Sequence, residues 1–259
     1  MYQDAIREIV VYTCIVGAYD NLNPLEDEEG VRYVCFTDQP GPLPPPWEAR
    51  PLQAPEEART NRLVNRYHKL HPHVLFPEAT RSVYIDGNLT FAGSFAAVAK
   101  CLDQHGLGFA AFSHPWSPHS LADEVEACIR HGKFTHSDQQ AVSRQLAKFD
   151  EEGMPRADTI PAGYFLARSH SQPLLAVCMQ EWWEQLLGFT GRDQVSLPYA
   201  LWKSGIPWAF LDRDLGISPV DVTRKPHEHR RSSLARVLRS LRKLAERITD
   251  SSAAPRTTR

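Results

Sequence analysis

The chain has 259 residues, of which 42% are hydrophobic and 23% are charged, as in ordinary globular proteins. Its formal net charge of -2 argues against a broad basic surface for nucleic acid. The five cysteines are scattered without a CxxC pair, which argues against a disulfide framework or a zinc ribbon. No apolar stretch approaches the roughly 20 residues that span a bilayer.

Apolar strand patterns alternate with helical patterns along most of the chain. Residues 9–16 form a continuous apolar and β-branched run that ends at Gly17, which is typical of a strand buried on both faces. Further strands are expected over 31–37, 83–85, 107–112, 159–168 and 206–211, and helices over 56–71, 95–105, 121–130, 138–152, 174–189 and from 191 onward. Residues 40–55 are rich in proline and predict an extended connector. This alternation favours an α/β fold with a mainly parallel central sheet.

Helix boundaries are predicted from capping residues and prolines. The helix over 56–71 should stop before Pro72, because the residue before a proline disfavours the helical conformation. Ser137 is the expected N-cap of the helix over 138–152.

A carboxylate and an amide follow the strand over 83–85. Asp86 and Asn88 are separated only by Gly87, at the end of a strand where α/β sheets bind ligands. Oxygens of this kind can hold a hard divalent cation and its phosphates. The alternative is an ordinary tight turn, since Asp-Gly and Gly-Asn are common turn pairs.

Three cations share one face of the helix over 56–71. Arg62, Arg66 and Lys69 stand at positions i, i+4 and i+7. They could neutralise a diphosphate, because arginine grips phosphate with two parallel hydrogen bonds. The alternative is a solvated basic face.

The C-terminal segment has a different composition. Arginines dominate residues 230–248, and leucines recur there at helical spacing, which predicts a basic amphipathic helix. Such a helix can lie on an anionic membrane surface, or it can pack its apolar stripe on the domain. Residues 1–8 are polar and carry no secretory signal, so we expect a cytoplasmic protein, peripheral at the inner face of the cell membrane if the helix binds there.

The ordered set of motifs resembles a known family. The segments in question are Val16-Gly17-Ala18-Tyr19-Asp20, Cys35-Phe36-Thr37-Asp38, Arg66-Tyr67-His68-Lys69, Tyr84-Ile85-Asp86-Gly87-Asn88, His114-Pro115 and Arg192-Asp193-Gln194. Together they resemble the TOD/MUCI-type glycosyltransferase-like domain family, formerly a domain of unknown function. More distantly they resemble the family-eight GT-A glycosyltransferases. The resemblance covers roughly residues 9–212.

The resemblance implies a single GT-A-like Rossmann-type domain over residues 1–229, followed by the basic helix and tail over 230–259. It places Thr13, Val16, Gly17, Ala18 and Tyr19 near the nucleotide. Asp86 and Asn88 stand at the family's Asp-x-Asp element for Mn²⁺ or Mg²⁺, where the amide weakens the site, and His227 is a candidate third ligand.

The resemblance also implies a sugar-handling role for Asp193 and Gln194. Asp193 would otherwise cap the start of its helix. His114 is a candidate for contact with the acceptor or the phosphates, and Gly163 would allow close approach of the backbone to the nucleotide sugar.

The expected function is transfer of a hexose from a nucleotide-diphosphate sugar, such as a UDP-sugar, to a glycan or glycolipid, with retention. A non-catalytic nucleotide-sugar or glycan-binding protein on the same scaffold is the main alternative. A lipid-amide hydrolase, an activity attributed to a plant relative, has little support, because the sequence contains no nucleophile elbow and no clear zinc cluster.

Overall fold

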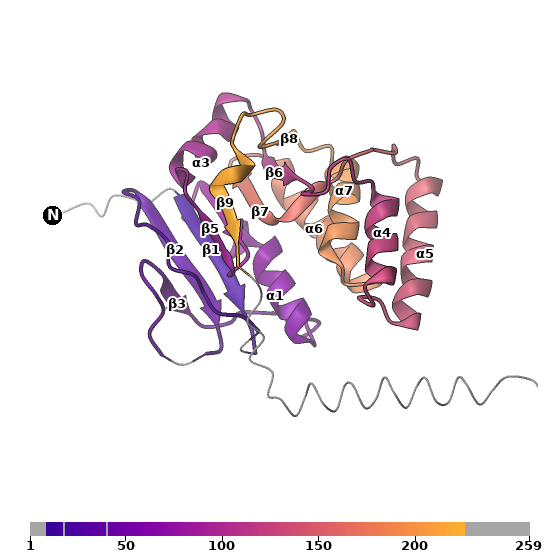
Figure 1. Cartoon of the computed structure of the whole chain (residues 1–259), viewed down its shortest axis with the longest axis horizontal. Helices are drawn as coiled ribbons and strands as arrows, with labels where there is room; N and C mark the ends of the chain where they lie inside the picture. The colour runs from indigo at the N-terminus through magenta and orange to yellow at the C-terminus, as the bar shows by residue number, and fades with distance from the viewer. Residues whose placement is uncertain (1–8, 18, 40, 226–259) are drawn as a thin grey trace, which may run out of the picture.

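The computed structural model describes residues 9–17, 19–39 and 41–225 (Figure 1). Its centre is a seven-stranded sheet in the order β3-β2-β1-β4-β7-β6-β8. The strands are β1 (Ile9–Ile15), β2 (Val31–Thr37), β3 (Glu48–Arg50), β4 (Arg81–Ile85), β6 (Phe109–Ser113), β7 (Pro161–Ser169) and β8 (Trp208–Phe210). Neighbouring strands pair in parallel except at β7, which is antiparallel to both β4 and β6. The expected α/β class with a mainly parallel sheet is therefore confirmed.

Side chains alternate between the two faces of the sheet and build two cores. On one face, Val10, Tyr12 and Cys14 of β1 pack with α1 (Asn61–Leu70), α2 (Pro72–Leu75), α6 (Leu174–Gly188) and α7 (Asp193–Ser204). On the other face, Val11 and Ile15 pack with α3 (Phe95–Gln104). Both faces of β1 are buried, which is why its sequence is a continuous apolar run.

Two further helices lie at the outer side of α7 (Figure 1). These are α4 (Leu121–Arg130) and α5 (His136–Glu151), which share a small third core with Val195 of α7. The prediction of Ser137 as the N-cap of this helix is wrong, because Thr135 caps α5. The Thr135 side chain accepts from the Asp138 amide, and the Asp138 side chain accepts from the Thr135 amide.

Other boundaries also differ from expectation. Helix α1 begins at Asn61, because the Thr60 side chain caps it by accepting from the Leu63 amide at 3.2 Å. Pro72 does end α1, but it also opens the short helix α2, where a missing N–H costs nothing. The proline-rich connector contributes β3, and a small second sheet pairs β5 (Leu89–Phe91) with β9 (Val222–Arg224), just after the short 3₁₀ turn Pro219–Asp221. These short strands carry too little pattern to be predicted.

Among the described residues, no helix is both long and apolar enough to cross a membrane. The expected basic helix over 230–248, and the tail that contains His227, lie outside the described residues.

Candidate active site

The reversed direction of β7 gathers the candidate residues at one edge of the sheet. Strands β1, β2, β4 and β6 all end there, and β7 begins there, since Ile85 pairs with Phe165 and Ser113 pairs with Pro161. The Asp86 amide continues the β4–β7 ladder by donating to the Tyr164 carbonyl at 3.0 Å. Asp86 and Gly163 therefore flank the same junction.

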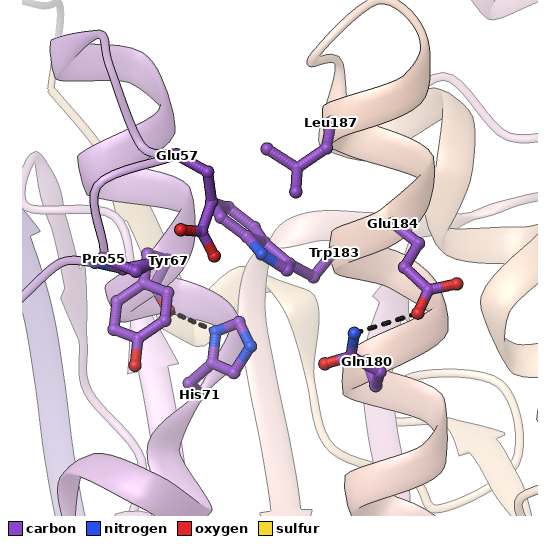
Figure 2. A pocket seen from close by; sticks show the side chains of 8 residues that line it. All are labelled: Pro55, Glu57, Tyr67, His71, Gln180, Trp183, Glu184 and Leu187. Carbon is purple, nitrogen blue, oxygen red and sulfur yellow. Dashed lines mark hydrogen bonds between the residues drawn. The ribbon is translucent and has the colours of Figure 1, made fainter.

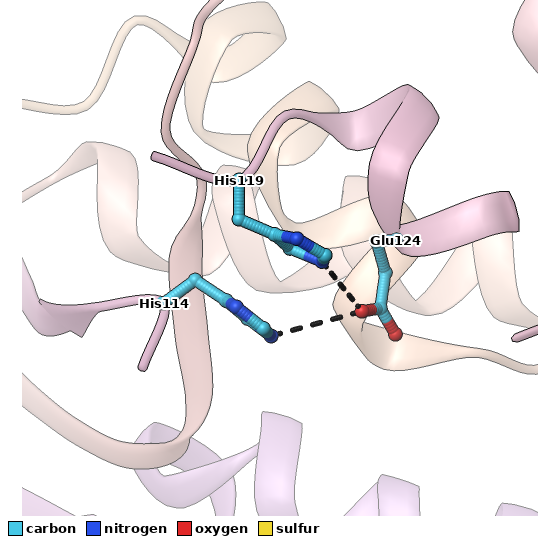
Figure 3. A group of neighbouring side chains, drawn as sticks. All are labelled: His114, His119 and Glu124. Atoms are coloured by element: carbon cyan, nitrogen blue, oxygen red, sulfur yellow. Dashed lines mark hydrogen bonds and ion pairs between the residues drawn. The ribbon is translucent and has the colours of Figure 1, made fainter. Parts of the chain in front are cut away.

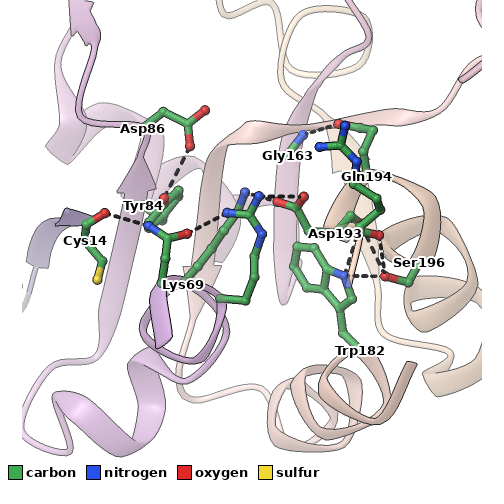
Figure 4. A network of polar contacts seen from close by, with 12 residues as sticks. Cys14, Lys69, Tyr84, Asp86, Gly163, Trp182, Asp193, Gln194 and Ser196 are labelled. Atoms are coloured by element: carbon green, nitrogen blue, oxygen red, sulfur yellow. Dashed lines mark hydrogen bonds and ion pairs between the residues drawn. The ribbon is translucent and has the colours of Figure 1, made fainter. Parts of the chain in front are cut away.

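A buried carboxylate held by two cations lies beside this junction (Figure 4). Lys69 Nζ lies 2.5 Å from Asp193 Oδ2, and Arg66 Nη2 lies 3.1 Å from Asp193 Oδ1. Asp193 is 7% exposed and Lys69 is 2% exposed. These three residues form the Asp193 cluster, which joins α1 to the start of α7.

The supporting contacts fix both helices. Arg192 stands at the N-cap position of α7 and Asp193 is the first helical residue, so Asp193 does not take the alternative role of helix cap, and its two oxygens pair with Arg66 and Lys69. Trp182 Nε1 of α6 donates to the Asp193 carbonyl at 3.2 Å. On α1, the Lys69 carbonyl accepts from the Tyr12 hydroxyl at 2.8 Å and from Arg168 Nη2 at 2.9 Å.

The charges in the cluster control one another. Burial by itself would raise the pKa of Asp193, but the nearby Arg66 and Lys69 outweigh it and hold that pKa below its usual range. Burial lowers the pKa of Lys69, and Asp193 and Asp86 oppose this shift. Burial likewise disfavours the charged form of Arg66, but Asp193 leads the groups that raise its pKa overall. Asp193 is thus an ionised acceptor at neutral pH.

Asp86 borders the cluster. Its Oδ1 accepts from the Tyr84 hydroxyl at 3.3 Å, and the Tyr84 ring lies 5.0 Å from Lys69 Nζ. Burial, followed by the charge of Asp86, raises the pKa of Tyr84 well above its usual value, so this hydroxyl stays protonated.

Asn88 lies 2% exposed in the turn after Asp86. Its Nδ2 donates to the Lys225 carbonyl at 2.7 Å, while its Oδ1 is buried without a hydrogen-bond partner. A buried oxygen without a partner, close in sequence to a carboxylate, fits the oxygen donor set of a hard cation. The third candidate ligand, His227, lies outside the described residues.

Gln194 clamps the start of β7. Its Oε1 accepts from the Gly163 amide at 2.9 Å, and its Nε2 donates to the Pro161 carbonyl. Both ends of the Gln194 amide thus bond to the backbone of β7 and hold that strand beside Asp193. A Cβ at Gly163 would lie 3.3 Å from Lys69 Nζ and 3.4 Å from Asp193 Oδ2, so glycine at this position keeps a side chain from pressing on the two charged groups.

Of the residues expected near the nucleotide at the end of β1, some lie at the sheet edge and others lie in the core. Gly17 lies at the sheet edge with φ 66°, and its amide donates to both oxygens of Asp38 at 2.9 Å. Tyr19 is 50% exposed and adds to the electrostatic shift of Arg66. Val16 and Thr13 do not join them: Val16 packs in the α1-side core, and Thr13 is fully buried. Ala18 lies outside the described residues.

Two other expected residues lie apart from the cluster. Arg62 is exposed one turn before Arg66 and takes no part in the pairing with Asp193. His114 follows β6 and packs against His119 and Glu124 (Figure 3). Burial, followed by the neighbouring His119, lowers the pKa of His114 to about 4, so its imidazole is neutral at pH 7.

A separate hollow of about 330 Å³ lies between α1 and α6 (Figure 2). Its walls include Tyr67 stacked on His71 with ring centroids 4.3 Å apart, and Trp183 edge-on to both. Its lining consists of Pro55, Glu57, Tyr67, His71, Gln180, Trp183, Glu184 and Leu187. It contains none of the expected site residues and is not part of the Asp193 cluster.

The profile of the TOD1/MUCI70 glycosyltransferase-like domain matches residues 56–210. The chain belongs to this family. The matched region includes every member of the Asp193 cluster, Asp86, Asn88 and the whole of β7. Family membership therefore assigns the chain a glycosyltransferase-like domain.

A likeness to one solved structure is weaker. The apo structure of the WbbM bifunctional glycosyltransferase aligns with a TM-score of 0.43 and 12% identity, over 78% of this chain and 38% of that chain. This chain thus spans well under half the length of that protein, and the likeness carries no argument about activity. A comparison with curated proteins finds no match.

The sequence did not identify several residues that support the site. Asn65 donates to the Cys14 carbonyl at 2.6 Å and accepts from Arg66 Nη1 at 2.6 Å, which orients the guanidinium. Trp182 and Tyr84 support Asp193 and Asp86 as described above. Asn65 stood one residue from an expected cation, but nothing in the sequence indicated the partner of Trp182 or Tyr84.

Proposed function

We propose that this protein is a glycosyltransferase that moves a hexose from a nucleotide-diphosphate sugar, of the UDP-sugar class, to a glycan or glycolipid acceptor with retention. The observation that carries the proposal is the Asp193 cluster, a buried carboxylate between two cations, at the sheet edge beside Asp86. In an α/β sheet this edge is where ligands bind.

Arg66 and Lys69 neutralise the negative charge of the leaving diphosphate. Sugar transfer accumulates negative charge on that group, and fixed cations stabilise it. Arg66 still has a donor to offer, because its Nε is buried without a partner while Nη1 and Nη2 are engaged. The Lys69 backbone is held through its carbonyl, and its ammonium is held by Asp193 Oδ2 at 2.5 Å.

Asp193 acts on the sugar. Its two oxygens each accept one bond from a cation, and a carboxylate has about four acceptor positions, so lone pairs remain for donor-sugar hydroxyls. Its ionised state also favours the positive charge that develops at the anomeric carbon. Gly163 places no side chain against this carboxylate, and Gln194 holds the backbone of β7 there.

Asp86 and Asn88, with His227 as a further candidate, would hold the Mn²⁺ or Mg²⁺ of this family type. The ion would supply Lewis-acid neutralisation of the diphosphate. Because Asn88 contributes a neutral oxygen in place of a carboxylate, the chain's own cations Arg66 and Lys69 carry more of that neutralisation.

The competing proposal is a non-catalytic nucleotide-sugar or glycan-binding protein. The neutral Asn88 favours it, since weaker metal binding lowers turnover more than ligand binding. We place either protein in the cytoplasm, with the basic segment 230–248 as its contact with an anionic inner membrane face.

The test is to incubate the purified full chain with a panel of UDP-sugars and Mn²⁺, and to measure released UDP and glycosylated acceptor. Asp193→Asn should abolish UDP release, whereas the matched change Asp150→Asn at the exposed end of α5 should leave it intact. A thermal-shift panel run in parallel detects binding, because a ligand at 100 times its dissociation constant adds about 2.7 kcal/mol of stability. Stabilisation by a UDP-sugar without UDP release would support the binding protein instead.

A further inference from the structure

Two histidines and a glutamate meet between the end of β6 and the start of α4 (Figure 3). His119 Nε2 lies 3.1 Å from Glu124 Oε2, and His114 Nε2 lies 3.7 Å from the same oxygen. The two imidazole rings stack with centroids 3.9 Å apart. One ligand atom from each residue lies within 4.8 Å of the others. These three side chains form the imidazole cluster.

Their separations suit a tetrahedral metal ion. Zinc binds nitrogen and carboxylate oxygen at about 2.0–2.2 Å, so two ligands of one tetrahedral ion lie about 3.3–3.5 Å apart. The observed separations of 3.1 and 3.7 Å between the histidine nitrogens and the carboxylate oxygen fall on either side of that value. The two rings stack at an interplanar angle of 16°, so one imidazole must rotate out of the stack before both nitrogens can direct their lone pairs at one ion.

The backbone holds the cluster together before any ion binds. The His114 amide donates to the Ile160 carbonyl at 3.0 Å, and the Ile160 amide donates to the His119 carbonyl at 3.1 Å. Both histidines are therefore pinned to one residue just before β7. Cys128 Sγ donates to Glu124 Oε1 at 3.3 Å, which orients the carboxylate from the next turn of α4.

We propose that His114, His119 and Glu124 form a binding site for a divalent transition-metal ion of the zinc class. Three protein donors leave one tetrahedral position for water. The site is distinct from the oxygen donors Asp86 and Asn88, and the inference stands whether or not the protein transfers sugars.

The donor set and its surroundings favour zinc over the harder cations. Imidazole nitrogen suits Zn²⁺, Co²⁺ and Ni²⁺, whereas Mg²⁺ and Mn²⁺ prefer oxygen. Lys133 and Arg224 also act electrostatically on His114. The electrostatic potential at the imidazole cluster is thus not strongly negative. A metal ion there would be held by its bonds to the three ligand atoms and not by a surplus of negative charge. Sequence alone missed this cluster, because its residues are spaced five apart, and that spacing is not a metal motif.

The experiment uses the full chain stripped with a chelator and then titrated with Zn²⁺ by calorimetry, and with Co²⁺ by visible absorption. The parent should bind one equivalent at this site and show the bands of tetrahedral Co²⁺. His119→Ala and Glu124→Gln should each weaken that equivalent by about 100-fold or more, since even outer partners of metal ligands cost 10–100-fold. Mg²⁺ at the same concentration should not compete.

Matched controls separate the cluster from other donors. Glu126→Gln on the exposed face of α4 and His136→Ala at the exposed start of α5 should retain the equivalent. A variant lacking both His227 and His229 should retain it as well. The proposal is overturned if the parent binds no zinc equivalent, if the His119 and Glu124 variants keep it, or if loss of the tail histidines removes it. Far-UV circular dichroism of each variant shows that a lost equivalent does not come from unfolding.

Discussion

Replacing Asp193 with asparagine preserves the shape of the side chain and removes its charge. Lys69 and Arg66 then lose the carboxylate that they share at 2.5 and 3.1 Å. The Arg66 side chain is 19% exposed and can turn toward water, but the Lys69 side chain is 2% exposed and cannot. The main cost is therefore one buried ammonium without a partner.

Removing one partner of a buried ion pair costs about 3–5 kcal/mol. We expect Asp193→Asn to lower the free energy of unfolding by that amount. For a domain of this size the loss corresponds to about 6–20 °C in Tm. Adding Lys69→Met should recover at least about 1 kcal/mol, because the two positions are in direct contact and the double variant no longer buries the charge.

Urea unfolding followed by tryptophan fluorescence measures these differences. Asp150→Asn is the matched control, since Asp150 pairs only loosely with Arg156 at 3.9 Å on the surface, and its removal should leave stability unchanged. An Asp193→Asn protein as stable as the parent would refute the reasoning, because it would mean that Lys69 and Arg66 do not depend on this carboxylate.

Three further predictions follow from the site. Gly163→Val should slow turnover at least about tenfold, because the new side chain would press on Lys69 and Asp193. Gly188→Ala, where a Cβ meets nothing within 4 Å, should not slow it. Equal turnover rates for the two variants would contradict a role for Gly163 beside the Asp193 cluster. The pKa of Asp193 is depressed in the folded state, so its stabilisation is present above the unfolded value of about 3.9 and is lost as pH falls below it. The parent should therefore lose more stability between pH 5 and pH 3 than Asp193→Asn, as measured by urea unfolding at each pH, and parallel losses would count against it. Asn88→Asp removes the hydrogen bond to the Lys225 carbonyl and should lower the free energy of unfolding by about 1–3 kcal/mol without metal. Mn²⁺ should then raise the Tm of this variant by more than it raises the Tm of the parent. A rise no larger than the parent's would argue against a cation site at this turn.

Much of the sheet edge was predictable from local patterns. The apolar run before Asp86 indicated a buried strand that ends there, and β4 does end at Ile85. Helical spacing placed Arg66 and Lys69 on one face of α1, and both do reach the same carboxylate. These predictions succeeded because strand burial and helix periodicity depend on neighbours within a few positions.

Other features depended on contacts distant in sequence. The direction of β7 did not follow from its apolar pattern, which is the same for either direction, yet it decides that Gly163 borders Lys69. Capping was only partly predictable, because Thr135 and Ser137 both offer a hydroxyl at the start of α5 and the path of the backbone selects Thr135. The sequence placed Gln194 beside Asp193, but only the fold shows that its amide bonds to the backbone of β7 at Gly163 and Pro161.

The sequence by itself determined the α/β class, the ends of the main strands, and the placement of cations on α1 and of a carboxylate after β4. Only the tertiary structure decided that Asp193 is an ion partner and not a helix cap, since Lys69 lies 124 positions away and reaches it through the packing of α1, α6 and α7. The physical reason is that the free energy of a charge depends on its burial and on its nearest opposite charges, and both are fixed by the fold.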